Sequence, residues 1–363
     1  MTPLSLHPFH QQRGARFISI NEAEVVGNYG AVSSEYDALV ESAGIFDLSF
    51  RSRVCLTGTD RIGFLHGQVT NDVNGLTPGR GCYAALITAK GKMQADLNIY
   101  RLQDELLLDF EPGLTPAVSQ RLEKYVISED VQITDVAAAY GLLSAQGPKA
   151  ETVIKSLQEF PELPDKPFSF VKQADERGEI YLMNRPRFGS AGYDLFLPVG
   201  ALASFADKLS KSAASVEGRF CGWEAGEMAR IEAGMPRFGA DMDETNIPLE
   251  AGLENSAISF NKGCYIGQEV ISRIRTYSQV GKALRGLRLA DDLQTLPAKG
   301  DKLYKEGKEA GYITSAIRSP RLKANIALGY VRREMNQIGT VLELRGDSSE
   351  TMARVVELPF VKG

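Results

Sequence analysis

Two neighbouring segments decide the fold class, Cys82–Thr88 (CYAALIT) and Met93–Leu102 (MQADLNIYRL). A Lys90-Gly91-Lys92 turn separates them, and this arrangement predicts two consecutive strands. Apolar and polar side chains alternate along the second segment, so that one face carries Met93, Ala95, Leu97 and Ile99 and the other carries Gln94, Asp96, Asn98 and Tyr100. The alternation predicts a strand with two chemically different faces.

The flanking segments extend this strand pair into a mixed unit. Strands are predicted at 53–58, 105–110 and 131–136, and helices at 60–67 and 114–127. A second, similar set begins near residue 140 and includes a helix from Leu202. Strands and helices do not follow the regular rhythm of a parallel sheet, so the pattern predicts an α+β architecture with two related antiparallel-sheet units.

The pattern changes after about residue 281. Short strand-like pieces follow, separated by Gly, Pro and charged turns, at 283–289, 302–307, 309–317, 324–331, 340–344 and 351–358. This spacing predicts a small β-barrel as the C-terminal domain. We therefore expect one region over residues 1–280 and a second domain over 281–363.

Composition narrows the classes of function. The formal net charge is -5, so the chain as a whole is not built to coat nucleic acid. No stretch approaches the twenty apolar residues of a membrane span, and the first residues do not resemble a signal peptide, so we expect a cytoplasmic protein. The four cysteines are far apart and the three histidines all lie in the first 66 residues, so no metal site is predicted.

The most informative short motif covers residues 262–269, Lys262-Gly263-Cys264-Tyr265-Ile266-Gly267-Gln268-Glu269. A helix is predicted from about Gly267, which would put Cys264 just before a helix N-terminus. There the backbone N–H groups, with the cations Lys262, Arg273 and Arg275, would favour the thiolate. The alternative is a small buried cysteine in a turn, and the spacing by itself leaves both open.

This motif resembles the K-G-C-Y-x-G-Q-E signature of the YgfZ family, folate-dependent proteins that maintain iron–sulfur enzymes. The segment His66–Val73 (HGQVTNDV) resembles the G-Q-V-T-x-D element of the same family. Nearly the whole chain is also similar to the wider glycine-cleavage T-protein superfamily. Segments that carry this similarity are Gly14–Phe17, Gly44–Ser49, Arg230–Met235 and Asp241–Thr245.

The resemblance implies a fold of two intertwined ferredoxin-like units around a central folate channel, followed by a C-terminal barrel. It also implies site residues. Asp96 would lie beside the reactive nitrogen of tetrahydrofolate or a derivative and assist proton movement. Tyr83 and Tyr100 would line the channel, and Arg230 would pair with the anionic ligand.

The residues alone allow plainer roles for these positions. Asp96 would be a solvated residue on the polar face of its strand, Tyr83 and Tyr100 core or rim residues, and Arg230 a bridge between domains. The basic residues from Arg273 to Arg288 would form either a solvated face or a contact for a folate tail or a partner protein.

Two departures from the T-protein pattern bear on activity. Ser190 stands where T-proteins carry a glutamate that holds the pterin's amino edge, and a hydroxyl is no charged bidentate acceptor. The run Phe46-Asp47-Leu48-Ser49-Phe50-Arg51 lacks the T-protein histidine. Both departures weaken the prediction of ordinary aminomethyl transfer.

We therefore expect a tetrahydrofolate-binding accessory protein that supports assembly or repair of iron–sulfur clusters through Cys264. Its partners would be folate and client iron–sulfur enzymes or their assembly proteins, with no nucleic acid or membrane, and it would be a monomer. The alternative is a tetrahydrofolate-dependent aminomethyltransferase or demethylase that uses Asp96. A third reading is a folate-binding module with neither activity.

Overall fold

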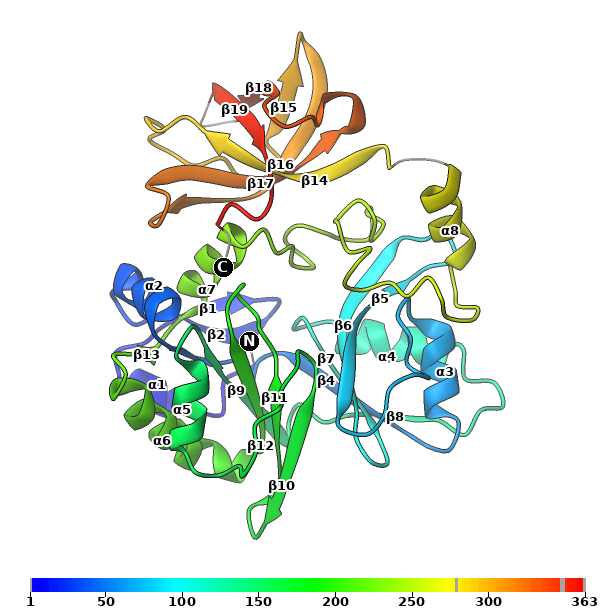
Figure 1. Cartoon of the computed structure of the whole chain (residues 1–363), viewed down its shortest axis with the longest axis vertical. Coiled ribbons are helices and arrows are strands. Elements are labelled where there is room, and N and C mark those ends of the chain that lie inside the picture. Colours follow the sequence, from blue (N-terminus) through cyan, green and yellow to red (C-terminus); the bar gives the residue numbers. More distant parts are fainter. Residues whose placement is uncertain (1, 278–279, 347–349, 362–363) are drawn as a thin grey trace. The chain divides into compact units, whose positions relative to one another are not determined.

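The computed structural model describes residues 2–277, 280–346 and 350–361 (Figure 1). Within these ranges the strands form a six-stranded, a five-stranded and a two-stranded sheet and one closed barrel. The chain divides into two compact units, Met1–Leu86 with Ala95–Glu227 and Ile87–Gln94 with Met228–Gly363. The predicted α+β class with antiparallel sheets and a C-terminal barrel is confirmed, and the domains 1–280 and 281–363 stay a prediction.

The five-stranded sheet of the first unit contains the two consecutive strands predicted at residues 82–88 and 93–102. Its order is β5-β6-β7-β4-β8, with β5 Arg80–Ile87, β6 Met93–Arg101, β7 Leu106–Phe110, β4 Ser52–Thr57 and β8 Gln132–Asp135. Helix α3 (Arg61–Gln68) follows β4, and α4 (Thr115–Glu123) follows β7. Without β5, this is the strand order and helix placement of a ferredoxin-like unit.

The six-stranded sheet repeats that plan with one insertion. Its order is β10-β11-β12-β9-β3-β13, with β10 Phe170–Asp175, β11 Gly178–Asn184, β12 Gly192–Pro198, β9 Tyr140–Gln146, β3 Gly44–Asp47 and β13 Arg219–Phe220. Helix α5 (Ala150–Ser156) follows β9, and the short helix η1 (Val199–Ala201) and α6 (Leu202–Ala214) follow β12. Strand β3 precedes all strands of the five-stranded sheet in the sequence, yet it belongs to the six-stranded sheet. The two ferredoxin-like halves of the first unit are therefore intertwined.

The N-terminal elements are tied to this inserted strand. They comprise α1 (His7–Gln11), the hairpin of β1 (Arg16–Ile20) and β2 (Ala23–Asn28), and α2 (Val32–Glu41). His10 of α1 is fully buried, and its Nε2 lies 2.9 Å from Oδ2 of Asp47 while its Nδ1 lies 2.8 Å from the Tyr29 hydroxyl. Both ring nitrogens are thus satisfied, as a buried imidazole requires.

Two hydrophobic cores stabilise the first unit, one on the helix side of each sheet. Ala95, Leu97 and Ile99 of β6 pack with α3 and α4 in one core, and Leu195 and Leu197 of β12 pack with α5 and α6 in the other. The apolar face predicted for β6 is therefore the core face.

The second unit holds the barrel, in the order β14-β17-β16-β15-β18-β19. The strands are β14 Lys282–Leu289, β15 Lys302–Lys305, β16 Lys308–Ser319, β17 Ala324–Arg332, β18 Val341–Arg345 and β19 Glu350–Val356, with the short helix η2 (Arg333–Met335) after β17. The six pieces predicted from the sequence are these strands. Helix α7 (Trp223–Glu232) runs across the boundary between the units, and α8 (Gln268–Tyr277) precedes the barrel. None of the described helices is long and apolar enough to cross a membrane.

Truncation of Leu97 to Ala should lower the free energy of unfolding by about 2–5 kcal/mol, because a fully buried side chain would be replaced by a cavity. The same kind of truncation at Ile127, which is 89% exposed, should change it by less than about 0.5 kcal/mol. Urea-induced unfolding followed by circular dichroism measures both. Equal effects at the two positions would contradict the packing described for β6.

Candidate functional site

The two sheets of the first unit face each other with the sides that do not carry helices. On β6 this side presents Asp96, Asn98 and Tyr100, because their neighbours Ala95, Leu97 and Ile99 point into the helix-side core. Asn98 and Tyr100 are buried, with Tyr100 fully so. The polar face of β6 is therefore an inter-sheet face, on which Asp96 is partly exposed and Asn98 and Tyr100 are buried.

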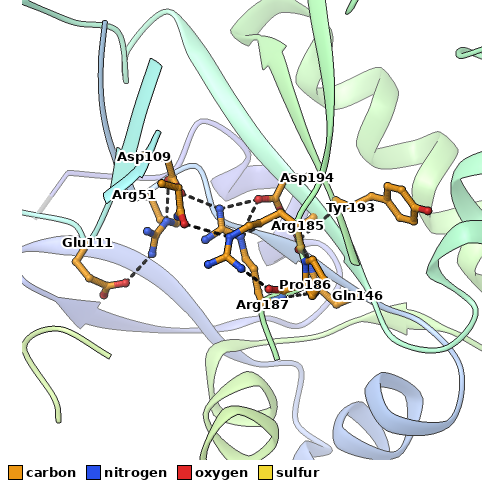
Figure 2. A network of polar contacts seen from close by, with 11 residues as sticks. Arg51, Asp109, Glu111, Gln146, Arg185, Pro186, Arg187, Tyr193 and Asp194 are labelled. Atoms are coloured by element: carbon orange, nitrogen blue, oxygen red, sulfur yellow. Dashed lines mark hydrogen bonds and ion pairs between the residues drawn. The ribbon is translucent and has the colours of Figure 1, made fainter. Parts of the chain in front are cut away.

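An inter-sheet ion-pair chain crosses this face (Figure 2). It consists of Glu111, Arg51, Asp109, Arg187 and Asp194, and its links are 2.6 Å for Glu111–Arg51, 2.8 Å for Arg51–Asp109, 2.8 Å for Asp109–Arg187 and 2.6 Å for Arg187–Asp194. Asp109 lies on β7 and Asp194 on β12, so one guanidinium joins the two sheets. Both aspartate side chains are completely buried.

Buried charges of this kind require partners on every side. Burial alone would raise the pKa of Asp109, but Arg51 and Arg187 outweigh it and hold that pKa well below its usual range. Ser144 of β9 donates to Asp194 at 2.7 Å, which satisfies a further carboxylate lone pair. Each charge of the ion-pair chain therefore depends on its neighbours.

A second set of polar contacts runs beside the ion-pair chain. Asn98 donates to Asp109 at 2.8 Å and accepts a hydrogen bond from Nε of Arg185 at 3.1 Å. Gln146 accepts from the backbone N–H of Arg187 at 2.9 Å and donates to the carbonyl of Arg185 at 3.0 Å (Figure 2). These bonds fix the segment between β11 and β12 that carries both arginines.

Asp96 lies on the same face and has a different environment. The hydroxyl of Tyr83, on the adjacent strand β5, donates to Oδ2 of Asp96 at 2.8 Å. The other oxygen, Oδ1, is buried and has no hydrogen-bond partner among the described residues. Burial, and then the charge of Glu111, raise the pKa of Asp96 above its ordinary value. A buried polar atom without a partner is uncommon, which makes Oδ1 of Asp96 a candidate contact for a ligand or an ordered water.

The phenol of Tyr83 keeps its proton in this position. Burial and the neighbouring Asp96 raise the pKa of Tyr83 well above 10. Tyr83 is thus a fixed donor that orients the Asp96 carboxyl group. The structure brings these two predicted site residues together.

Tyr100 occupies a more enclosed position than a channel-lining role suggests. Its ring centroid lies 6.0–6.1 Å from those of Phe168, Phe170 and Phe196, which come from the other sheet and the segment before it. Its hydroxyl is buried and has no hydrogen-bond partner in the described part of the chain. Ser190 lies half-buried in the segment between β11 and β12. Ligand contact stays a prediction for both residues.

Arg230 belongs to the second unit and is bound to neighbours there. Its Nη1 lies 2.7 Å from Oδ2 of Asp241, and its Nη2 donates to the Ser315 hydroxyl of β16 at 3.1 Å. Asp241 also accepts from Thr314 at 2.6 Å. These contacts link α7 to the barrel, and a role in ligand pairing stays a prediction.

The 262–269 motif leads into α8, whose first two residues are Gln268 and Glu269, so the helix begins one residue after the predicted start. Cys264 is exposed, whereas Cys55 and Cys221 are buried and Cys82 is partly buried. The buried-turn reading of Cys264 is therefore wrong. Gly267 has a φ of 84°, and an added Cβ would lie 2.5 Å from the Thr88 carbonyl oxygen, so this position requires glycine.

The remaining motif residues divide between packing and solvent. Lys262 is largely buried, with its ammonium 4.9 Å from the ring centroid of the buried Tyr265, and Glu269 forms an exposed ion pair with Arg273. Gly263 is exposed and Gln268 partly buried. Nowhere in the described ranges do three or more His, Cys, Asp or Glu side chains gather so that they could hold a metal ion.

Comparison with protein families accounts for this architecture. Residues 6–262 match the GCVT N-terminal domain, and residues 282–362 match the glycine cleavage T-protein C-terminal barrel domain. The chain belongs to the glycine cleavage T-protein family. The match supports the superfamily and does not reach the YgfZ branch.

Relatives of the T-protein family cover this chain from end to end. The aminomethyltransferase of Bacillus subtilis is 28% identical over 98% of both chains, and that of Halalkalibacterium halodurans is 29% identical over 100% of this chain and 99% of the relative. The crystal structure of glycine cleavage system aminomethyltransferase T from Bartonella henselae superposes with a TM-score of 0.88 at 23% identity, over 99% of this chain and 98% of that one. At that identity the structural likeness shows the fold.

Several residues of the inter-sheet face were not predicted as site residues, namely Arg51, Asp109, Glu111, Arg185, Arg187 and Asp194. A signal was available for the two aspartates, because each is the single charge inside an apolar strand segment, LLLDF and YDLFLP. Such a charge must find a partner when the strand is buried. The arginines lie outside the strands, where a charged residue is ordinary.

Replacing Arg187 with Met should lower the free energy of unfolding by about 3–5 kcal/mol, because it leaves two buried carboxylates without their shared cation. Arg13→Met is the matched control, since Arg13 pairs with Asp207 on the surface, where such pairs contribute about 0–1 kcal/mol. Chemical unfolding at pH 7 measures both variants. A loss at Arg187 no larger than at Arg13 would contradict the role given to the ion-pair chain.

Proposed function

We propose that this protein is a tetrahydrofolate-dependent transferase of a one-carbon unit, of the aminomethyltransferase type. The observation that carries the proposal is the Asp96 carboxyl group, in which one oxygen accepts a hydrogen bond from Tyr83 and the other is buried without a partner among the described residues. The family and the relatives named aminomethyltransferase support this alternative better than the iron–sulfur role expected from the sequence.

The residues around Asp96 fit a folate amine. Tetrahydrofolate supplies nitrogen atoms that carry the one-carbon unit. Because its pKa is raised, Asp96 holds a proton at higher pH than an exposed aspartate does, and Oδ1 is the position from which it would move. Tyr83 keeps the carboxyl plane fixed, which lowers the cost of orienting the acid for transfer.

The ion-pair chain would support this site without touching the substrate. It fixes β7 against β12 and the segment that carries Arg185 and Arg187, and β6 lies beside β7 in the sheet. Ser190 offers a hydroxyl where the resembling T-proteins offer a carboxylate. The pterin's amino edge would therefore be held by a weaker acceptor in this chain.

Asp96→Asn should reduce kcat for tetrahydrofolate-dependent transfer from a methylated amine or aminomethyl donor by about 10²–10⁴-fold, the usual contribution of a general acid or base. Melting temperature should be nearly unchanged, because the amide still accepts from Tyr83. Asp104→Asn, an exposed carboxylate in the turn after β6, is the matched control and should leave kcat unchanged. Turnover by Asp96→Asn equal to that of the wild type would refute the proposed role of Asp96.

A second candidate function rests on the exposure of Cys264 within the complete KGCYIGQE motif. In that case the protein would support iron–sulfur clusters of other enzymes, and the thiol would be the essential group. Restoring iron–sulfur enzyme activity in cells that lack a YgfZ-type factor separates the two candidates. The transferase proposal expects Cys264→Ala and its control Cys82→Ala to behave alike, whereas the second candidate expects loss with Cys264→Ala alone.

A further inference from the structure

Glu111 is a buried carboxylate that the transfer chemistry does not itself require. It directly follows β7, only 6% of its side chain is exposed, and its Oε1 lies 2.6 Å from Nη1 of Arg51. Arg51 also binds Asp109 through Nε at 2.8 Å. This guanidinium is therefore shared between two carboxylates.

Asp96 forms no ion pair with a cation in the described part of the chain. Its hydrogen-bond partner is the neutral Tyr83 hydroxyl, and Arg51, the cation that lowers its pKa, is engaged by Glu111 and Asp109. A buried carboxylate without a cation is costly, whereas a neutral carboxylic acid is not. The arrangement favours a proton on Asp96.

We propose that Glu111 is a positioning residue that keeps Asp96 in its acid form until a ligand arrives. This inference rests on the proposed function for the identity of the ligand. Asn98 of β6 pairs with Asp109 of β7 in antiparallel register, and the same register carried two residues further sets Glu111 opposite Asp96. From that position Glu111 acts in two ways, by placing a negative charge near Asp96 and by occupying the Arg51 guanidinium that would otherwise stabilise the Asp96 carboxylate.

The proton has one suitable position. Oδ2 accepts from Tyr83, so the acid hydrogen belongs on Oδ1, the buried oxygen that lacks a partner in the described structure. The ligand atom that meets Oδ1 must then be a hydrogen-bond acceptor. An amine nitrogen with an available lone pair has this property, and a protonated amine or an amide N–H does not.

The charged and titratable groups that act on Asp96 come from three neighbouring elements. They are Tyr83 of β5, Arg51 before β4 and Glu111 after β7, and Arg185 in the segment after β11 acts on Tyr83. Burial and Glu111 raise the pKa of Asp96, while Tyr83 and Arg51 lower it. Because the folded-state pKa is raised, Asp96 stays protonated above the usual range and loses its proton as the pH rises through the folded value.

The test is infrared spectroscopy of the ligand-free, full-length protein, which detects the C=O stretch of a protonated carboxyl group. The band that disappears in Asp96→Asn is assigned to Asp96 and followed against pH. In Glu111→Gln, which keeps an oxygen for Arg51 and removes the charge, this band should be lost at lower pH than in the wild type. Glu111→Asp keeps the charge and should retain more of the wild-type behaviour.

Glu123→Gln removes an exposed carboxylate from α4 and is the matched control, expected to leave the band unchanged. In steady-state assays the high-pH limb of kcat should move to lower pH in Glu111→Gln, with little change in KM for tetrahydrofolate. A merely structural role would instead lower kcat equally at every pH.

An unshifted Asp96 band in folded Glu111→Gln would overturn the inference. If that variant does not fold, the pH titration of the Asp96 band in the wild type is the test. A band that titrates at the ordinary pKa of about 3.9 would likewise overturn the inference. The spectra use no folate. An Asp96 band that responds to Glu111 in a protein without transfer activity would refute the proposed function and leave the effect of Glu111 in place.

Discussion

The guanidinium of Arg187 binds both sheets of the first unit and fixes their position relative to each other. It lies between Asp109 of β7 and Asp194 of β12, at 2.8 and 2.6 Å, in a place where neither carboxylate reaches solvent. A buried charge tolerates little displacement, because each lost contact leaves an uncompensated ion. The ion-pair chain from Glu111 to Asp194 thus limits sliding and separation of the two sheets. An apolar interface of the same area would allow more displacement.

The position of Asp96 follows from this constraint. Asp96 and Asn98 point to the same side of β6, and Asn98 is bonded to both the ion-pair chain and Arg185. A strand whose middle is fixed in this way carries its next polar residue to a defined place, where Tyr83 of β5 binds it. The shared Arg51 connects the same chain to the protonation of Asp96. The residues that fix the position of β6 thus overlap with those that influence the protonation of Asp96.

Much of this architecture could be predicted from the sequence. Period-two alternation identified β6 and its core face, and the regular Gly- and charge-punctuated pieces identified the six barrel strands, because both patterns are local. Strand β3 was missed, since four consecutive buried residues show no alternation and its neighbours β9 and β13 are far along the chain. The ion-pair chain was missed for the same reason. Asp109, Arg187 and Asp194 acquire meaning only when the two sheets are placed face to face.

The central claim is that the unpartnered oxygen of Asp96 is where the protein meets its ligand. A crystal structure of the protein with bound tetrahydrofolate tests it most directly. We predict a ligand nitrogen at about 2.6–3.2 Å from Oδ1 of Asp96, with the Tyr83 hydrogen bond and the ion-pair chain unchanged. A folate bound elsewhere, or one whose nitrogens all lie beyond hydrogen-bond distance from that oxygen, would contradict the account.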